Sequence, residues 1–112
     1  MKEMKLFLNH ILESVSSIEI FIKDLDLEAF KKNDLVRSAV VQKFQVIGEA
    51  SNKLPEEFRK AHPEIPWGKM IGMRNILSHF YFGIKWDLVW ITAKERITEI
   101  KTGIENILKA LQ

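Results

Sequence analysis

The chain has 112 residues, of which 46% are hydrophobic and 29% are charged, and its formal net charge is +2. This length and composition predict a single globular domain over residues 1–112 and exclude a fibrous or disordered chain. The small net charge does not identify a class of partner, although it allows a local basic patch.

The first predicted helix begins near Met4 and ends near Leu25. Apolar residues recur there every three to four positions, which is typical of an amphipathic helix with one buried face. They are Met4, Phe7, Leu8, Ile11, Leu12, Val15, Ile18, Ile22 and Leu25. Asp26 follows in a position to cap a short helical turn within DLDLEAFKKND.

A second long helix is predicted after Asn33 or Asp34, either of which can cap it, and it should end near Leu54 because Pro55 follows. Its apolar stripe contains Val36, Val40, Phe44, Ile47 and Leu54, and its polar side contains Ser38, Gln42, Gln45, Glu49 and Lys53. A glycine inside a helix costs about 1 kcal/mol relative to alanine. Gly48 therefore suggests that another helix approaches closely at this point.

The segment PEEFRKAHPEIP is predicted to connect this helix to the third one, with room for one helical turn. Pro66 can occupy the first turn of the third helix, and Gly83 can end that helix in a left-handed conformation. The predicted apolar stripe of the third helix consists of Met73, Ile76, Leu77, Phe80 and Ile84.

Asp87 can cap a fourth long helix, which has the most regular apolar stripe in the chain. This stripe consists of Val89, Trp90, Ala93, Ile97, Ile100, Ile104, Ile107 and Leu111. Four long helices with short connections predict an all-α fold, namely an up-and-down four-helix bundle with short extra helical turns.

Several classes of site and location are not expected from this sequence. There is no cysteine, and the three histidines do not have metal-ligand spacing, so we expect neither a metal ion nor another cofactor. No stretch approaches the roughly 18 apolar residues of a membrane span. The first residues also lack a signal-peptide cleavage site, so no membrane partner and a cytoplasmic location are expected.

The stretch MRNILSHFYFGI gathers polar residues on one side of the third predicted helix. At about 100° per residue, Arg74, Asn75, Ser78 and His79 span about 140°. Asn75 can orient His79 by a hydrogen bond, since the two are four residues apart. An arginine can hold a phosphate, and a histidine can act as general base or acid. RNA supplies its own 2′-hydroxyl nucleophile, so such a pair could cleave it without a metal.

A second interpretation of the same stretch is purely structural. Arginine and histidine are also favoured at a helix C-terminus by the helix dipole, as a capping or surface pair. Two apolar residues, Ile71 and Phe82, are predicted to point toward the polar side and therefore need a cover. The simplest cover is a second copy of the chain, so a homodimer with its seam beside Arg74 and His79 is predicted.

The string RNILSHFY resembles the motif of arginine, four residues, histidine, one residue and tyrosine that marks the HepT family, a branch of the HEPN superfamily. Four further strings resemble that family in order and spacing and extend the resemblance over nearly the whole chain: IGEA, IPW, GMRN and DLVW.

The resemblance implies an all-helical homodimer that acts as a metal-independent ribonuclease toxin. It also implies a partner, a small MntA-type nucleotidyltransferase antitoxin that silences the toxin by transferring AMP to the motif tyrosine. Arg74 and His79 would then be catalytic, Asn75 and Ser78 would support them, and Tyr81 would accept AMP. The alternative is a non-catalytic module that binds a nucleotide or substrate for the neighbouring nucleotidyltransferase.

Other residues have competing interpretations. Glu49 could pair with an arginine at the site, but its polar neighbours favour a solvated or helix-pairing role. The tryptophans could stack on bases, but they are more typical of core anchors, above all Trp90 within its apolar stripe. Arg37 and Lys43 could line a path for phosphates, although basic residues are common on exposed helix surfaces.

Overall fold

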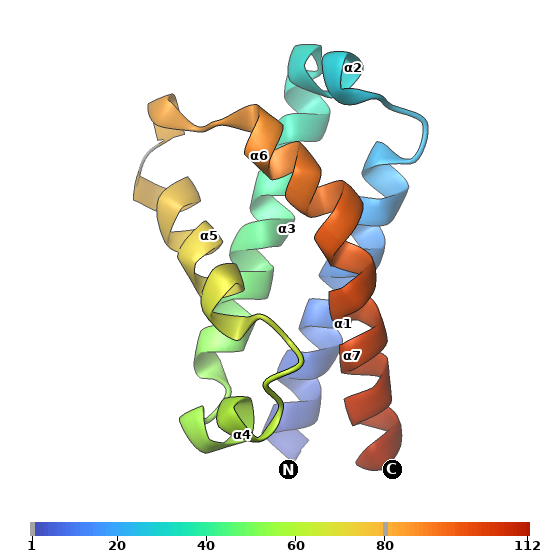
Figure 1. Cartoon of the computed structure of the whole chain (residues 1–112), viewed down its shortest axis with the longest axis vertical. Helices are drawn as coiled ribbons and strands as arrows, with labels where there is room; N and C mark the ends of the chain where they lie inside the picture. The colour runs from blue at the N-terminus through green and yellow to red at the C-terminus, as the bar shows by residue number, and fades with distance from the viewer. Residues whose placement is uncertain (1, 80) are drawn as a thin grey trace.

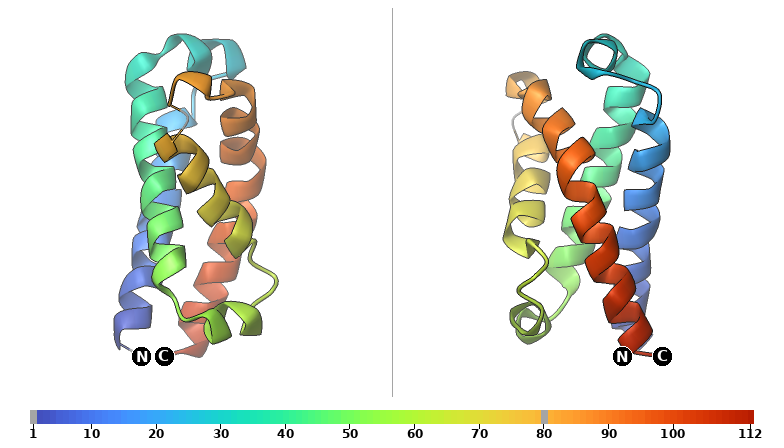
Figure 2. Two further views of the ribbon diagram at one scale, coloured as in Figure 1. Left: turned by 90° about the vertical axis from the view of Figure 1, so that its left-hand side faces the viewer. Right: turned by 45° about the vertical axis from the view of Figure 1, so that its right-hand side comes forward.

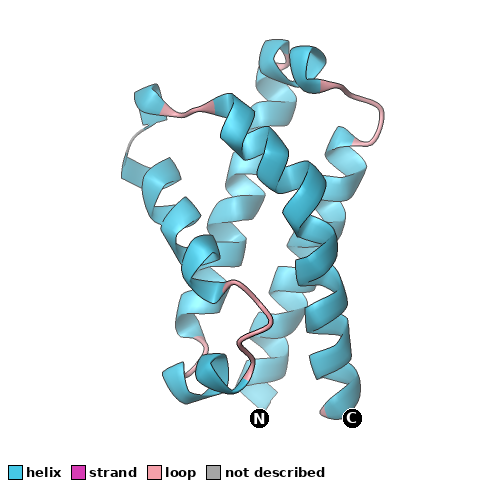
Figure 3. Cartoon of the chain, viewed as in Figure 1, coloured by secondary structure: helices cyan, strands magenta, loops and turns pink. Residues whose placement is uncertain are grey.

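The computed structural model describes residues 2–79 and 81–112, apart from the side chain of Tyr81. The predicted all-α fold is confirmed, because these residues form helices and connecting loops and no strand (Figure 3). The long elements are α1 (Lys2–Ile22), α3 (Asp34–Lys53), α5 (Trp67–His79) and a last helical stretch that contains α6 (Trp86–Ile91), a π-helical turn (Thr92–Arg96) and α7 (Ile97–Ala110). They run alternately up and down, as predicted (Figure 1).

Two short helices close the ends of the bundle. At one end α2 (Leu27–Lys32) joins α1 to α3, and at the other α4 (Glu56–Ala61) joins α3 to α5. Both termini lie at the end that carries α4 (Figure 2). A short 3₁₀ turn, Tyr81–Gly83, follows α5 at the opposite end. The polar motif is therefore placed far from the termini.

The local caps are partly as predicted. The Asp26 carboxylate accepts a hydrogen bond from the Ala29 N–H at 2.8 Å, and the Asn33 side chain accepts from the Val36 N–H at 3.0 Å. The predicted cap at Asp87 is wrong, because α6 begins one residue earlier. Asp87 instead lies in the first turn, where a carboxylate interacts favourably with the helix dipole, and it forms an ion pair with Lys31 of α2 at 3.1 Å.

The predicted left-handed cap at Gly83 is also wrong. No glycine among the described residues has a positive φ, and α5 ends at His79. Gly83 instead belongs to the 3₁₀ turn Tyr81–Gly83, a short element common near helix ends that needs no left-handed residue. At the other end of α5, the carbonyl of Pro66 accepts from the N–H groups of Lys69 and Met70, both at 3.1 Å, so Pro66 directly precedes the first turn.

The predicted stripes of the other long helices meet in one core, whereas the stripe of α5 contributes buried Leu77 and partly buried Met73 and Ile84. Phe80 lies outside the described residues. α3 packs against both α1 and α5, and α1 also packs against α7. The fully buried side chains include Leu8, Ile11, Val15, Ile18, Val40, Ile47, Leu77, Ile97, Ile100 and Ile104. Trp67 and Trp90 are buried as well, so the prediction that they anchor the core is confirmed.

Additional polar and apolar features define the surface of the bundle. Lys101 of α7 donates a hydrogen bond to Glu19 of α1 at 3.0 Å, and this bond raises the pKa of Lys101. None of the described helices is long and apolar enough to cross a membrane.

The predicted place of Ile76 in the buried stripe of α5 is wrong, because this residue is 47% exposed. The reason lies in how α5 meets α3.

Candidate functional site

Gly48 sets the contact between α3 and α5. It is buried, and a Cβ atom added there would overlap Arg74 Cβ and lie 2.9 Å from both Arg74 Cγ and the carbonyl oxygen of Met70. The expectation of a close helix approach at Gly48 is therefore confirmed. Because α5 faces α3 through Met70 and Arg74, its opposite side, which carries Ile76, is left exposed.

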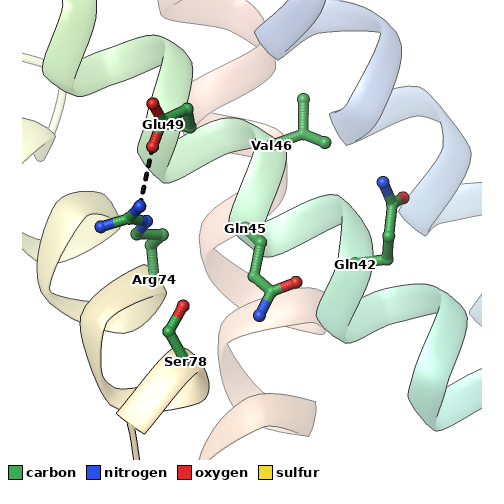
Figure 4. A pocket seen from close by; sticks show the side chains of 6 residues that line it. All are labelled: Gln42, Gln45, Val46, Glu49, Arg74 and Ser78. Atoms are coloured by element: carbon green, nitrogen blue, oxygen red, sulfur yellow. Dashed lines mark ion pairs between the residues drawn. The ribbon is translucent and has the colours of Figure 1, made fainter.

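Arg74 is held by two oxygen atoms from two different helices. Its Nη2 lies 2.9 Å from Oε2 of Glu49 on α3, and its Nη1 donates to Oδ1 of Asn75 at 3.1 Å (Figure 4). The side chains of Arg74 and Glu49 are 37% and 48% exposed, so solvent and ligands can reach the pair. The arginine is thus oriented before any ligand arrives.

The Glu49 ion pair settles a question that the sequence left open. The polar neighbours of Glu49 favoured a solvated or helix-pairing role over a place at the site. The structure gives it a helix-pairing role and, through the same contact, a place beside Arg74. The signal that could have found this pairing is Gly48, since the residue after a close-contact glycine lies near the same partner helix.

The hydrogen bond predicted from Asn75 to His79 is not formed. Within the described part of the chain, the Asn75 side-chain oxygen accepts from Arg74, and no hydrogen bond joins Asn75 to His79. The nearby guanidinium is the stronger donor for that oxygen, because it is charged. His79 is the last residue of α5, and its imidazole is exposed, as is Ser78.

Beside Arg74 the surface is hollowed between α3 and α5. This hollow has a volume of about 320 Å³ and is lined by Gln42, Gln45, Val46, Glu49, Arg74 and Ser78 (Figure 4). A second hollow of about 240 Å³ shares both glutamines with it and extends along α3 to Ser38, Asp34, Val41 and Trp86. Sequence reasoning did not assign the glutamines to the site, although they share the polar side of α3 with Glu49.

The structure does not bring every candidate together. Arg37 does not line the first hollow; its guanidinium lies 4.8 Å from the centre of the Trp86 ring, and its Nη2 lies 3.4 Å from Asp34. The side chain of Tyr81 lies outside the described residues. Phe82 is fully exposed and Ile71 is half-buried, so the homodimer that would cover them stays a prediction.

The assembled groups define what the site can do chemically. Arg74 offers a fixed cation in an open hollow, which suits a phosphate group. His79 offers an exposed imidazole on the same helix, which can exchange a proton. In the described residues there is no cluster of three or more histidine or acidic side chains that could hold a metal ion.

Comparison with known proteins identifies the family to which the chain belongs. The profile described as "Ribonuclease HepT-like" matches residues 11–107. The chain is 42% identical over 106 residues to "Putative RNase MJ1380" of Methanocaldococcus jannaschii, with 95% of this chain and 97% of the relative covered. It is 38% identical over 103 residues to "Probable ribonuclease HepT" of Thermococcus cleftensis, with 92% and 94% covered. No solved structure matches the chain significantly.

Proposed function

Because this chain belongs to the ribonuclease HepT-like family, we propose that it is a metal-independent endoribonuclease that cleaves RNA with Arg74 and His79. The observation that carries the proposal is the orientation of Arg74, which Glu49 and Asn75 hold at an open hollow. His79 follows on the same helix with an exposed imidazole. A phosphate binder and a proton carrier thus lie on the same helix.

The proposed reaction needs no nucleophile from the protein. A general base removes the proton of an RNA 2′-hydroxyl, the 2′-oxygen forms a bond to the adjacent phosphorus, and the bond from phosphorus to the 5′-oxygen breaks. A general acid gives that leaving oxygen a proton, so the products carry a 2′,3′-cyclic phosphate and a 5′-hydroxyl. His79 serves in proton transfer, and Arg74 stabilises the charge that develops on the phosphate oxygens.

The proposed active form is a homodimer. One chain supplies one motif histidine, whereas the displacement at phosphorus uses a base for the 2′-hydroxyl and an acid for the 5′-oxygen. A second copy packed beside Arg74 and His79 would bring a second set of these groups near the same phosphate. The exposure of Phe82, next to this surface in sequence, supports such a seam.

The proposed biological role is that of a toxin in a toxin–antitoxin pair. An MntA-like nucleotidyltransferase antitoxin would silence the enzyme at Tyr81. In that step the tyrosine oxygen bonds to the α-phosphorus of ATP, pyrophosphate leaves and the phenol loses its proton. The added nucleotide, two residues after His79, would place negative charge where the RNA phosphate must bind, and it would compete for Arg74.

The test is RNA cleavage in excess EDTA by full-length protein whose mass shows that Tyr81 is unmodified. We expect wild-type protein to leave cyclic-phosphate ends. Arg74→Ala and His79→Ala should each lower the rate by at least about a hundredfold, because each removes a group that acts in the transition state. Circular dichroism and sedimentation show whether each variant keeps the wild-type fold and oligomeric state.

A matched control separates the motif histidine from histidines in general. His10 is exposed on α1, so His10→Ala should cleave at the wild-type rate. Equal inactivity of wild type and His79→Ala would contradict the proposal and would favour the module that presents a nucleotide or substrate to the transferase. Cleavage that disappears in EDTA would remove metal independence alone.

A further inference from the structure

The two adjoining hollows on α3 contain side chains that the proposed chemistry does not use. Gln42 and Gln45 line both hollows, Ser78 lies at the first, and Ser38 and Trp86 lie at the second. In the described part of the chain, no side-chain hydrogen bond involves either glutamine amide or either serine hydroxyl. These donors and acceptors are therefore available to a ligand.

These residues form a continuous feature, which we call the amide groove and define by Ser38, Gln42, Gln45 and Ser78. The three residues from α3 are spaced by four and then three positions, so they share one side of the helix. From Ser38 to Glu49 the helix rises about 16 Å. Figure 4 shows the Gln45 amide extending from α3 toward the end of α5 that carries Ser78.

The charges of the amide groove are confined to its two ends. Arg74 and Glu49 form an ion pair at one end, and Arg37 lies 3.4 Å from Asp34 near the other. The middle is lined by neutral amides and hydroxyls. A phosphate is favoured beside an arginine at an end, whereas the middle suits an uncharged group that both donates and accepts hydrogen bonds.

A nucleobase is such a group. A side-chain amide offers a donor and an acceptor next to each other, and this arrangement matches the edges that bases present. Those edges are accessible on unpaired RNA bases, which proteins splay out and bind individually, but they are engaged or hidden in an A-form duplex. At the far end of the groove, half-buried Trp86 lines the second hollow, with Arg37 over its ring.

We propose that the amide groove binds an unpaired nucleobase next to the phosphate held by Arg74, and that the substrate is therefore single-stranded RNA. Gln42 and Gln45 read the edge of the base. This inference rests on the proposed ribonuclease function, because the groove extends the same site. It adds a base-binding subsite and a preference for unpaired strands.

The experiment measures binding without cleavage. Fluorescently labelled 2′-fluoro RNA lacks the attacking hydroxyl, so it cannot react by the proposed route. Dissociation constants are measured by fluorescence anisotropy for a single strand, for its duplex, and for single strands with one abasic position moved along the chain. The proteins are unmodified wild type, a variant with Gln42→Ala and Gln45→Ala, and the matched control Asn106→Ala, which removes an exposed amide on α7.

We expect wild type and Asn106→Ala to bind the single strand about tenfold or more tightly than the duplex, and to lose about tenfold in affinity at one abasic position. With the intact strand, the double variant should bind about tenfold more weakly than wild type. The abasic position should not weaken its binding further, because both changes remove the same interaction. Since Gln42 is exposed and Gln45 is half-buried, folding should be unaffected. The single substitutions repeat the measurement with less perturbation.

Three results would overturn the subsite: equal binding of duplex and single strand, an unchanged response of the double variant to every abasic position, or no binding of any oligonucleotide by wild type. Weakened self-association of the double variant in sedimentation, with unchanged RNA binding, would instead assign the groove to a second copy of the chain. Cleavage of ordinary RNA is measured separately. If the glutamine substitutions and the abasic position remove the same binding interaction but the wild-type protein does not cleave RNA, the subsite is supported and the ribonuclease proposal is contradicted.

Discussion

The helices α7 and α5 both carry apolar residues, but only α7 gathers them on one regular face. α7 buries Ile97, Ile100, Ile104 and Ile107 at regular helical spacing. α5 buries only Trp67, Met70 and Leu77, and the positions between and after them carry Arg74, Ser78 and His79. α7 packs against α1, whereas α5 packs against α3 at a glycine.

This difference indicates where function can be placed in a small bundle. A domain of this size has one core, and nearly all the inward-facing residues of α7 are buried in it. On α5, Arg74 lies against Gly48 of α3, but its side chain is partly exposed at the hollow. A half-exposed ion pair contributes little to stability, so the ion pair with Glu49 gives Arg74 no large stabilising role.

The largest expected effect is a loss of stability caused by a core substitution on α7. Ile104 is completely buried, so Ile104→Ala removes apolar contacts and leaves a cavity. We expect a loss of about 2–5 kcal/mol in the free energy of unfolding, measured by urea denaturation with circular dichroism. In contrast, His79→Ala on α5 should change it by less than about 0.5 kcal/mol, because the imidazole is exposed.

The same two stability measurements test whether α7 is buried in the core and whether the His79 side of α5 is exposed in solution. A large loss of stability in His79→Ala would mean that the imidazole, exposed in the single chain, is itself buried at the seam of the proposed homodimer. The loss would then depend on protein concentration, since association stabilises the folded chain by mass action. An unchanged stability of Ile104→Ala would contradict the assignment of α7 to the core.

A moderate effect is expected at the glycine that joins α5 to α3. In Gly48→Ala the new methyl group meets the stem of Arg74 and the backbone oxygen of Met70, neither of which can move aside easily. The gain in helix propensity of about 1 kcal/mol is outweighed by overpacking of about 1–3 kcal/mol, so we expect a net loss of about 1 kcal/mol. Displacement of Arg74 should also lower RNA cleavage by up to about a hundredfold.

The control for this change lies on α5 itself. A Cβ atom at Gly72 would have no atom within 4 Å, so Gly72→Ala should raise stability by up to about 1 kcal/mol and leave cleavage unchanged. If Gly48→Ala behaves in the same way, the close approach of α3 and α5 does not position Arg74.

Much of this architecture could be predicted from the sequence because it depends on local rules. Periodic apolar residues identified the four long helical stretches, and Asp26 and Asn33 were recognised as caps from their side-chain chemistry. Gly48 indicated a close helix contact through its cost in a helix interior. These signals come from neighbours along the chain and need no knowledge of the tertiary contacts.

The features that escaped prediction depend on how one helix rotates against another. Ile76 matches the apolar period of α5, but the contact at Gly48 turns it outward. Asn75 was expected to bond His79 four residues later, but it bonds Arg74, whose guanidinium reaches it from the preceding position. The adjoining hollows with Gln42 and Gln45 arise only when α3 and α5 are brought together.

The smallest expected effect concerns the carboxylate that holds Arg74. Glu49→Ala frees the guanidinium, so we expect kcat to fall about tenfold because an arginine that must be ordered during the reaction stabilises the transition state less. Glu49→Gln keeps an oxygen acceptor at the same place and should recover part of that loss. Stability should change by less than about 1 kcal/mol in both variants, because the ion pair is partly exposed. Single-turnover cleavage and urea unfolding separate the two effects. If both variants cleave faster than wild type, Glu49 restrains Arg74 rather than positioning it. The contact between α5 and α3 would then hold the arginine back from the substrate instead of preparing it.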